Sequence, residues 1–201
     1  RKLMKGFMEG RSVREKCRKG IPGSMYQDEI EEILAGFPVC QCGFLDPEEI
    51  LFSDRVRYIC RSQCGRYGKS WSCPPAVGEV DECRKRCLAY DKVLIFTTLA
   101  EVSDSAMLEE TLLTRKGHEG VMRGVLCEME GAGARCLALS SESCSICEAC
   151  TYPGGPCRHP DRMLPCIESY GILVTESAEK CGIDFFYDSQ TVTWFGMIFY
   201  V

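Results

Sequence analysis

The feature that most constrains this chain is a run of four closely spaced cysteines around residue 150. Residues 144–157 read CSICEACTYPGGPC, so two, two and six residues separate Cys144, Cys147, Cys150 and Cys157. Short Cys-x-x-Cys-x-x-Cys runs with one more distant cysteine are typical of iron–sulfur ligation, whereas zinc sites usually draw on two separated Cys-x-x-Cys pairs. We therefore predict a turn-rich loop whose four thiolates hold an iron–sulfur cluster. Zinc and unligated thiols are the alternatives.

A second group of cysteines lies in the first half of the chain. Gaps of three, eight, nine and three residues separate its members, which are Cys60, Cys64, Cys73, Cys83 and Cys87. Glycines and prolines over residues 64–78 predict a shaped loop rather than a regular element. The first three cysteines are clear ligand candidates, and either of the last two, on one face of a predicted helix, completes a four-thiolate site. Alternatively, three cysteines hold a 4Fe-4S cluster whose fourth iron stays open as a Lewis acid.

Composition places the chain among ordinary globular proteins. Its 201 residues are 45% hydrophobic and 26% charged, which indicates neither a disordered chain nor a membrane protein. Sixteen cysteines without a visible export signal favour metal binding in a reducing, oxygen-poor cytoplasm over a disulfide framework.

Charge is distributed unevenly along the chain. Residues 1–20 hold eight Arg or Lys against two Glu, or +6, which leaves −11 for the remainder of a chain with net charge −5. We predict a basic N-terminal segment over residues 1–23 and a single cysteine-rich metal-binding domain over residues 24–201. The segment is either solvated or bound to an acidic partner. The acidic remainder has no basic patch interleaved with aromatic residues, which excludes nucleic-acid binding, and we expect no membrane association.

The hydrophobic pattern predicts an α/β fold of mixed α+β character. A continuous apolar run at 92–98, a long helix at 105–129 and a strand at 135–140 form a predicted right-handed βαβ unit. The chain is expected to end in a β-hairpin of 183–187 with 191–201. The remaining expected elements are a short strand within 37–45 and short helices at 24–35, 55–61, 79–89 and 175–181.

The two cysteine-rich stretches together resemble a known family. The runs CGRYGKSWSCPPAVGEVDEC and CSICEACTYPGGPCRHP are similar to the family catalogued as domain of unknown function 2284, described as predicted metal-binding proteins. The resemblance covers about residues 40–200 and leaves the reaction open. Ser commonly stands in that family where this chain has Cys166, so the resemblance assigns Cys166 no ligand role. The positions that it implicates are Cys60, Cys64, Cys73, Cys83, Cys144, Cys147, Cys150, Cys157 and Arg158.

Several other residues deserve an interpretation. Arg158 directly follows the last ligand candidate, and we predict that it donates to cluster sulfur or offsets cluster charge. His118 and His159 are interpreted as ordinary residues, with a ligand or proton-donor role as the alternative for His159. The remaining cysteines are read as core or unligated thiols, with Cys40 and Cys42 as alternative ligands; the others are Cys17, Cys127, Cys136 and Cys181.

These observations lead to three functional hypotheses. The first is a cytoplasmic protein with two 4Fe-4S clusters, acting in electron transfer or as a redox accessory to a partner enzyme. The second is an enzyme whose first cluster binds a small anionic or sulfur-containing substrate at an open iron. The third is a zinc-stabilised interaction module. A fourth cysteine at the first site favours electron transfer, and its absence favours the enzyme; no residue stands out as a general acid or base.

Overall fold

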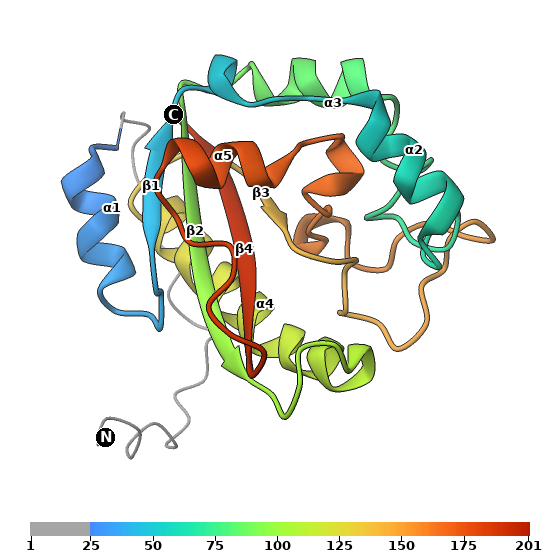
Figure 1. The fold of residues 1–201 in the computed structure, drawn as a ribbon. Helices are drawn as coiled ribbons and strands as arrows, with labels where there is room; N and C mark the ends of the chain where they lie inside the picture. The colour runs from blue at the N-terminus through green and yellow to red at the C-terminus, as the bar shows by residue number, and fades with distance from the viewer. Residues whose placement is uncertain (1–24) are drawn as a thin grey trace.

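A computed structural model of the chain describes residues 25–201, so the predicted basic segment at 1–23 lies outside the described residues. Its centre is a four-stranded antiparallel sheet with the order β1-β2-β4-β3 (Figure 1). The strands are β1 (Cys42–Leu45), β2 (Lys92–Glu101), β3 (Cys136–Ser140) and β4 (Thr191–Tyr200). The helices are α1 (Gln27–Leu34), α2 (Asp54–Gln63), α3 (Val80–Cys87), α4 (Leu108–Gly131) and α5 (Val174–Lys180), with short 3-10 turns η1 (Pro47–Glu49), η2 (Pro160–Arg162) and η3 (Glu168–Tyr170). The predicted mixed α+β class is confirmed.

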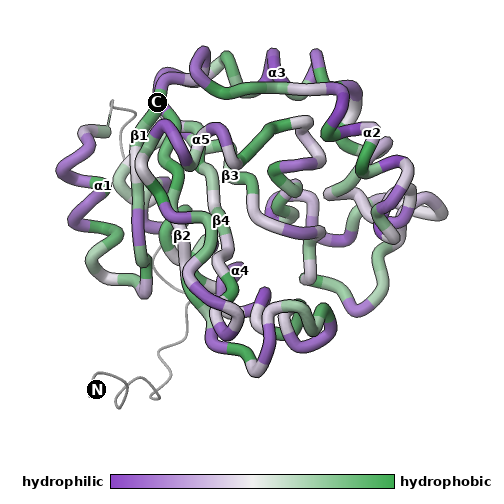
Figure 2. The backbone as a smooth tube through the Cα atoms, in the orientation of Figure 1, coloured by the Kyte–Doolittle hydropathy of each residue, from purple (hydrophilic) through white to green (hydrophobic). Residues whose placement is uncertain are grey.

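The two longest strands occupy the middle of the sheet because their sequences suit burial on both faces. β2 is buried from Val93 to Thr98, and β4 from Trp194 to Tyr200. They pair along their whole length, from Lys92 with Tyr200 to Glu101 with Thr191. A strand covered on both faces carries a continuous apolar run rather than an alternating one. Figure 2 shows this concentration of hydrophobic residues in the central strands.

The sheet separates two hydrophobic cores. On one face, Leu94, Phe96 and Ile198 pack with residues of α1 and α4. On the other face, Val93, Ile95, Phe195, Met197 and Phe199 pack with residues of α3, η3 and α5. Successive side chains of a strand point to opposite faces, which is why neighbouring residues of β2 fall into different cores. Val77, in the first of the two cysteine-rich loops, belongs to this second core.

The βαβ prediction needs a refinement. β2, α4 and β3 follow one another as expected, but β2 and β3 are not neighbours, because β4 lies between them and pairs antiparallel with both. β2, α4 and β3 therefore form a split βαβ unit, in which the last strand of the chain, β4, lies between β2 and β3.

The predicted C-terminal hairpin is wrong. Residues 183–187 form no strand, and β4 pairs with β2 and β3 instead. A hairpin would need one edge of β4, but β2 and β3 pair with both of its edges, and its last seven residues are all buried. Phe185 instead stacks on Phe195 with ring centroids 5.1 Å apart. Burial of β4 on both faces thus favours the central position over the edge of a hairpin.

All five predicted helices are confirmed, and the long one packs closely on the sheet. α4 approaches β4 at Gly196, where an added Cβ would collide with the Sδ of Met122. Among the described residues, no helix combines the length and apolar character that crossing a membrane requires.

Candidate metal centre

The first pocket has a volume of about 400 Å³ and lies between α2, the loop after it and η3. Four cysteines line it: Cys60 near the end of α2, Cys64 at the C-terminal cap of α2, Cys73 in the following loop, and Cys166 just before η3. The rest of its wall is mainly apolar. The structure thus brings together three predicted ligands and one cysteine to which sequence reasoning gave no ligand role.

Contacts across the first pocket tie Cys166 to the other cysteines. Its backbone N–H donates to the carbonyl oxygen of Ser72, the residue before Cys73, at 3.2 Å. Its thiol donates to the Oε2 of Glu168 at 2.8 Å. The carbonyl oxygen of Glu168 lies 4.0 Å from the Sγ of Cys60. The pKa of Cys73 is raised to about 11, chiefly by burial; a hydrogen bond from Ser72 opposes this rise, and the neighbouring Cys64 and Cys60 add to it.

Two carboxylates, Glu142 and Glu168, also line the first pocket. Burial raises the pKa of Glu168. Glu142 has a φ of 61°, the left-handed region that non-glycine residues rarely adopt, and such backbone is enriched at functional sites. Sequence reasoning missed both residues, since isolated Glu residues carry no ligand spacing. The two carboxylates thus add acidic groups to a pocket whose wall is otherwise mainly apolar.

Cys83 and Cys87, the two candidates for the fourth ligand, do not line the first pocket. Both lie on α3 and are fully buried in the core below the sheet. The Sγ of Cys83 faces the Nη2 of Arg86 at 3.2 Å and the carbonyl oxygen of Val77 at 3.6 Å. Their ligand role stays a prediction without support from this geometry.

The second pocket is lined by all four cysteines of the 144–157 run, together with residues of the other cysteine-rich loop. Its volume is about 20 Å³, so holding a cluster requires the surrounding side chains to move outward. The residues that complete its wall are Ser70, Trp71, Ile146, His159 and Met163. Cys144, Cys147, Cys150 and Cys157 thus line one pocket. Their role as metal ligands stays a prediction.

Hydrogen-bond donors surround the sulfur of Cys150. Although burial raises its pKa, the backbone N–H groups of Tyr152, Trp71 and Thr151 and the hydroxyl of Ser70 hold that pKa below its usual value. The indole of Trp71 also donates to the carbonyl oxygen of Gly155 at 3.0 Å and meets the ring of Tyr152 edge-on. Donors aimed at a thiolate are the surroundings that metal–sulfur sites use to tune the centre.

The two pockets share a wall, which we define as residues 70–73 and 143–144. In the first segment, Trp71 faces the second pocket and Cys73 the first; in the other, Ser143 faces the first pocket and Cys144 the second. Ser72 is fully buried between them. Its hydroxyl accepts a hydrogen bond from the N–H of Cys144 at 2.9 Å and lies 3.8 Å from the Sγ of Cys73. One serine thus contacts a cysteine of each pocket.

The other predicted residues lie around these pockets or away from them. Arg158 is exposed and donates to the carbonyl oxygen of Ala149 at 2.9 Å, so it braces the 144–157 loop; donation to cluster sulfur stays a prediction. His118 is a buried core residue held by Thr98 and Phe195. Cys17 is outside the described residues. Five other cysteines line neither pocket: Cys40, Cys42, Cys127, Cys136 and Cys181. Cys127 is disulfide-bonded, which its interpretation as a core or unligated thiol did not predict.

One protein family matches most of this chain, including both cysteine-lined pockets. The family described as predicted metal-binding protein (DUF2284) matches residues 43–200, which include both pockets and all of the sheet except Cys42. The chain belongs to this family. No curated protein and no solved structure matches it. DUF2284 membership supports metal binding without naming the metal.

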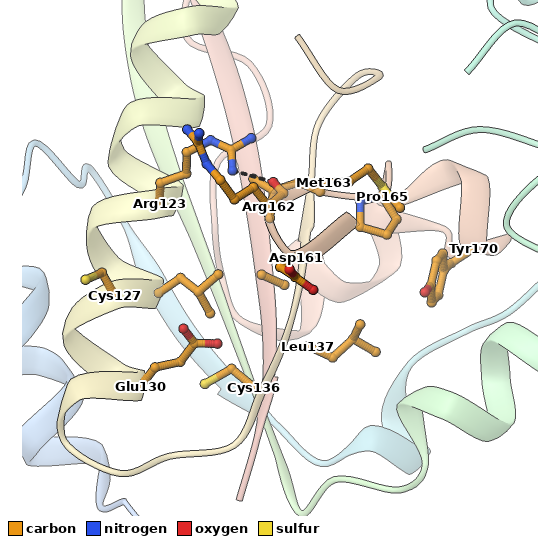
Figure 3. Close-up of a pocket in the computed structure, with 13 residues that line it drawn as sticks. Arg123, Cys127, Glu130, Cys136, Leu137, Asp161, Arg162, Met163, Pro165 and Tyr170 are labelled. Atoms are coloured by element: carbon orange, nitrogen blue, oxygen red, sulfur yellow. Dashed lines mark hydrogen bonds between the residues drawn. The ribbon is translucent and has the colours of Figure 1, made fainter. Parts of the chain in front are cut away.

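Two further features of this DUF2284 protein concern metal-binding groups and a pocket beside α4. Within residues 25–201, no three Cys, His, Asp or Glu side chains form a group that could hold a metal ion. A third pocket, with a volume of about 900 Å³, lies between α4, β3 and residues 161–165 (Figure 3). There Arg123 donates to the carbonyl oxygen of Arg162, while Glu130 and Asp161 contribute acidic groups. This large pocket holds neither cysteine set.

Proposed function

We propose that this DUF2284 protein binds two 4Fe-4S clusters and acts in electron transfer, either as a carrier or as a redox accessory to a partner enzyme. The observation that carries the proposal is the pair of cysteine-lined pockets on either side of one wall. Each pocket offers four thiols, and soft thiolate sets of this kind select iron–sulfur clusters or zinc among biological metals. The two-residue gaps between Cys144, Cys147 and Cys150 favour the cluster.

The residues present fit such a group. When bound, a 4Fe-4S cluster supplies one-electron redox chemistry. The chain's own contribution is to hold and tune the centre: the donors around Cys150 lower the basicity of its sulfur, and Trp71 covers the second pocket from the side of the other loop. Apolar side chains of the first pocket, including Val56 and Leu173, help to shield the buried sulfur of Cys73 from water. Both effects set reduction potential in proteins of this class.

The shared wall supports passage of electrons between two centres. Only a buried serine and two peptide segments separate the cysteines of one pocket from those of the other. Exposed Cys64 and exposed Cys150 bring the outer side of each pocket to the surface, where a redox partner protein gains access. We propose a reducing compartment, the cytoplasm, for this activity, because fourteen of the fifteen cysteines in residues 25–201 are free thiols and one, Cys127, is disulfide-bonded.

One observation favours the enzyme as a second candidate. At about 400 Å³, the first pocket is in the range of small-molecule sites, and Arg66 on its rim offers a cation for an anionic substrate. This candidate requires an iron without a protein ligand. A zinc-stabilised interaction module is the third candidate, since a four-cysteine set also suits zinc.

The test is the metal and acid-labile sulfide content of protein purified without oxygen. We expect about eight iron and eight sulfide per chain, as two 4Fe-4S clusters require. Addition of small anions and thiols should leave the electron paramagnetic resonance spectrum of the reduced protein unchanged. A ligand-dependent spectrum would favour the enzyme. Zinc without sulfide would refute the redox proposal and leave the interaction module.

A further inference from the structure

Cys166 occupies a position that suggests a ligand. It stands on the wall of the first pocket opposite α2, and it reaches that position because residue 166 forms a parallel bridge with Ser140 at the end of β3. The bridge therefore places Cys166, which follows Cys73 by 93 residues in the sequence, at the same pocket as Cys73. Its side chain is half-buried, like that of Cys60, so it is accessible from the pocket and shielded from bulk water.

Glu168 connects Cys166 with Cys60. The carboxylate of Glu168 accepts the thiol hydrogen of Cys166, while the backbone carbonyl of the same residue lies near the Sγ of Cys60. On the opposite side, the N–H of Cys166 is bonded to the carbonyl of Ser72. These contacts hold Cys166 between two predicted ligands, Cys60 and Cys73.

Cys83 is fixed in another way. Its Sγ has Arg86 at 3.2 Å, Arg57 at 3.9 Å and the carbonyl oxygen of Val77 at 3.6 Å. Arg57 in turn donates to the carbonyl oxygens of Gly78 at 2.7 Å and Ser169 at 2.6 Å. Turning Cys83 toward the first pocket would break this arrangement inside a closed core. Its surroundings are those of a structural thiol beside two guanidinium groups.

We propose that Cys166, and not Cys83, is the fourth protein ligand of the first centre, a proposal that rests on the proposed function. Cys60, Cys64, Cys73 and Cys166 each lose one proton to solvent when the iron–sulfur bond forms, so the site carries four thiolates. No iron of that cluster then stays open to substrate. The first centre is an electron carrier, and the enzyme candidate loses the open position that it requires.

The experiment compares Cys166→Ala with Cys83→Ala, both purified without oxygen. We expect Cys83→Ala to keep the iron, sulfide and spectra of the wild type. We expect Cys166→Ala to lose about one iron per chain and, when oxidised, to show the paramagnetic signal of a three-iron cluster, because one iron then has no thiolate. Unchanged iron and spectra in Cys166→Ala, or their loss in Cys83→Ala alone, would overturn the proposal.

Alkylation of the wild-type protein provides a second test that does not depend on a variant folding. With the clusters in place, Cys166 should resist iodoacetamide while exposed Cys40 reacts; after chelation of iron, Cys166 should react as well. Equal labelling of Cys166 before and after chelation would refute its ligand role. Wild-type protein that contains no sulfide would instead overturn the proposed function itself, so the two failures are distinguishable.

Discussion

Replacing Ser72 with alanine tests the wall between the two pockets. Ser72 is fully buried, and its hydroxyl is the acceptor for the N–H of Cys144 and the partner of the Ser70 hydroxyl, both at 2.9 Å. Alanine keeps the backbone, including the carbonyl that receives the N–H of Cys166. The substitution therefore removes only the hydroxyl that joins one pocket to the other.

The expected cost follows from the group left without a partner. A buried N–H that loses its acceptor destabilises a protein by about 1–3 kcal/mol. For a chain of this size each kcal/mol lowers the melting temperature by about 2–4 °C, so Ser72→Ala should melt about 2–12 °C lower. The spectra of both centres should also change, since Ser72 contacts Cys73 as well as Cys144.

The assay is anaerobic thermal unfolding followed by spectroscopy of the reduced protein. Ser62→Ala is the matched control, because Ser62 is exposed on α2 and its hydroxyl bonds only to backbone carbonyls of its own helix. The control should stay within about 0.5 kcal/mol of the wild type. A Ser72→Ala protein with the melting temperature and spectra of the wild type would refute our account of the wall.

Three further predictions concern separate parts of the molecule. Cys147→Ser should lose about half of the iron and destabilise the 144–157 loop, because metal binding is coupled to folding; retention of full iron would contradict a ligand role. Burial lowers the pKa of His118 to about 4 from 6.5. The free energy of unfolding should therefore fall by on the order of 3 kcal/mol as the pH drops from 6.5 toward 4. His118→Gln should make the stability measured by urea titration less dependent on pH. Gly196→Ala should lower the free energy of unfolding by about 1–3 kcal/mol, because the added methyl group collides with Met122. An unchanged urea midpoint would contradict this prediction and show that α4 moves away from the sheet without cost.

The second pocket was the part of the site most accessible to sequence reasoning. Its four ligand candidates lie within fourteen residues, so their convergence depends on local turns alone. Trp71 and Ser70, which also line it, come from the other cysteine-rich loop, and the sequence pattern did not predict their place there. Local spacing identifies a binding loop, whereas the fold decides what covers it.

The first pocket could be predicted only in part, for a topological reason. Cys166 reaches Cys73 through the pairing of β3 with β4 and the bridge between Ser140 and Cys166. A helical spacing of four residues made Cys83 and Cys87 attractive, but that face of α3 packs into the core. The hairpin prediction excluded the position of β4 between β2 and β3. That position puts β3 at the edge of the sheet and so sets where the chain after Ser140 begins.

The most direct test of the account is the electron paramagnetic resonance spectrum of the fully reduced protein, compared with those of Cys64→Ser and Cys147→Ser. Paramagnetic clusters on the two sides of one wall couple magnetically, so the spectrum of the wild type should be broader than the sum of the two single-centre spectra. A wild-type spectrum equal to that sum, or a protein without a reducible signal, would contradict two adjacent clusters.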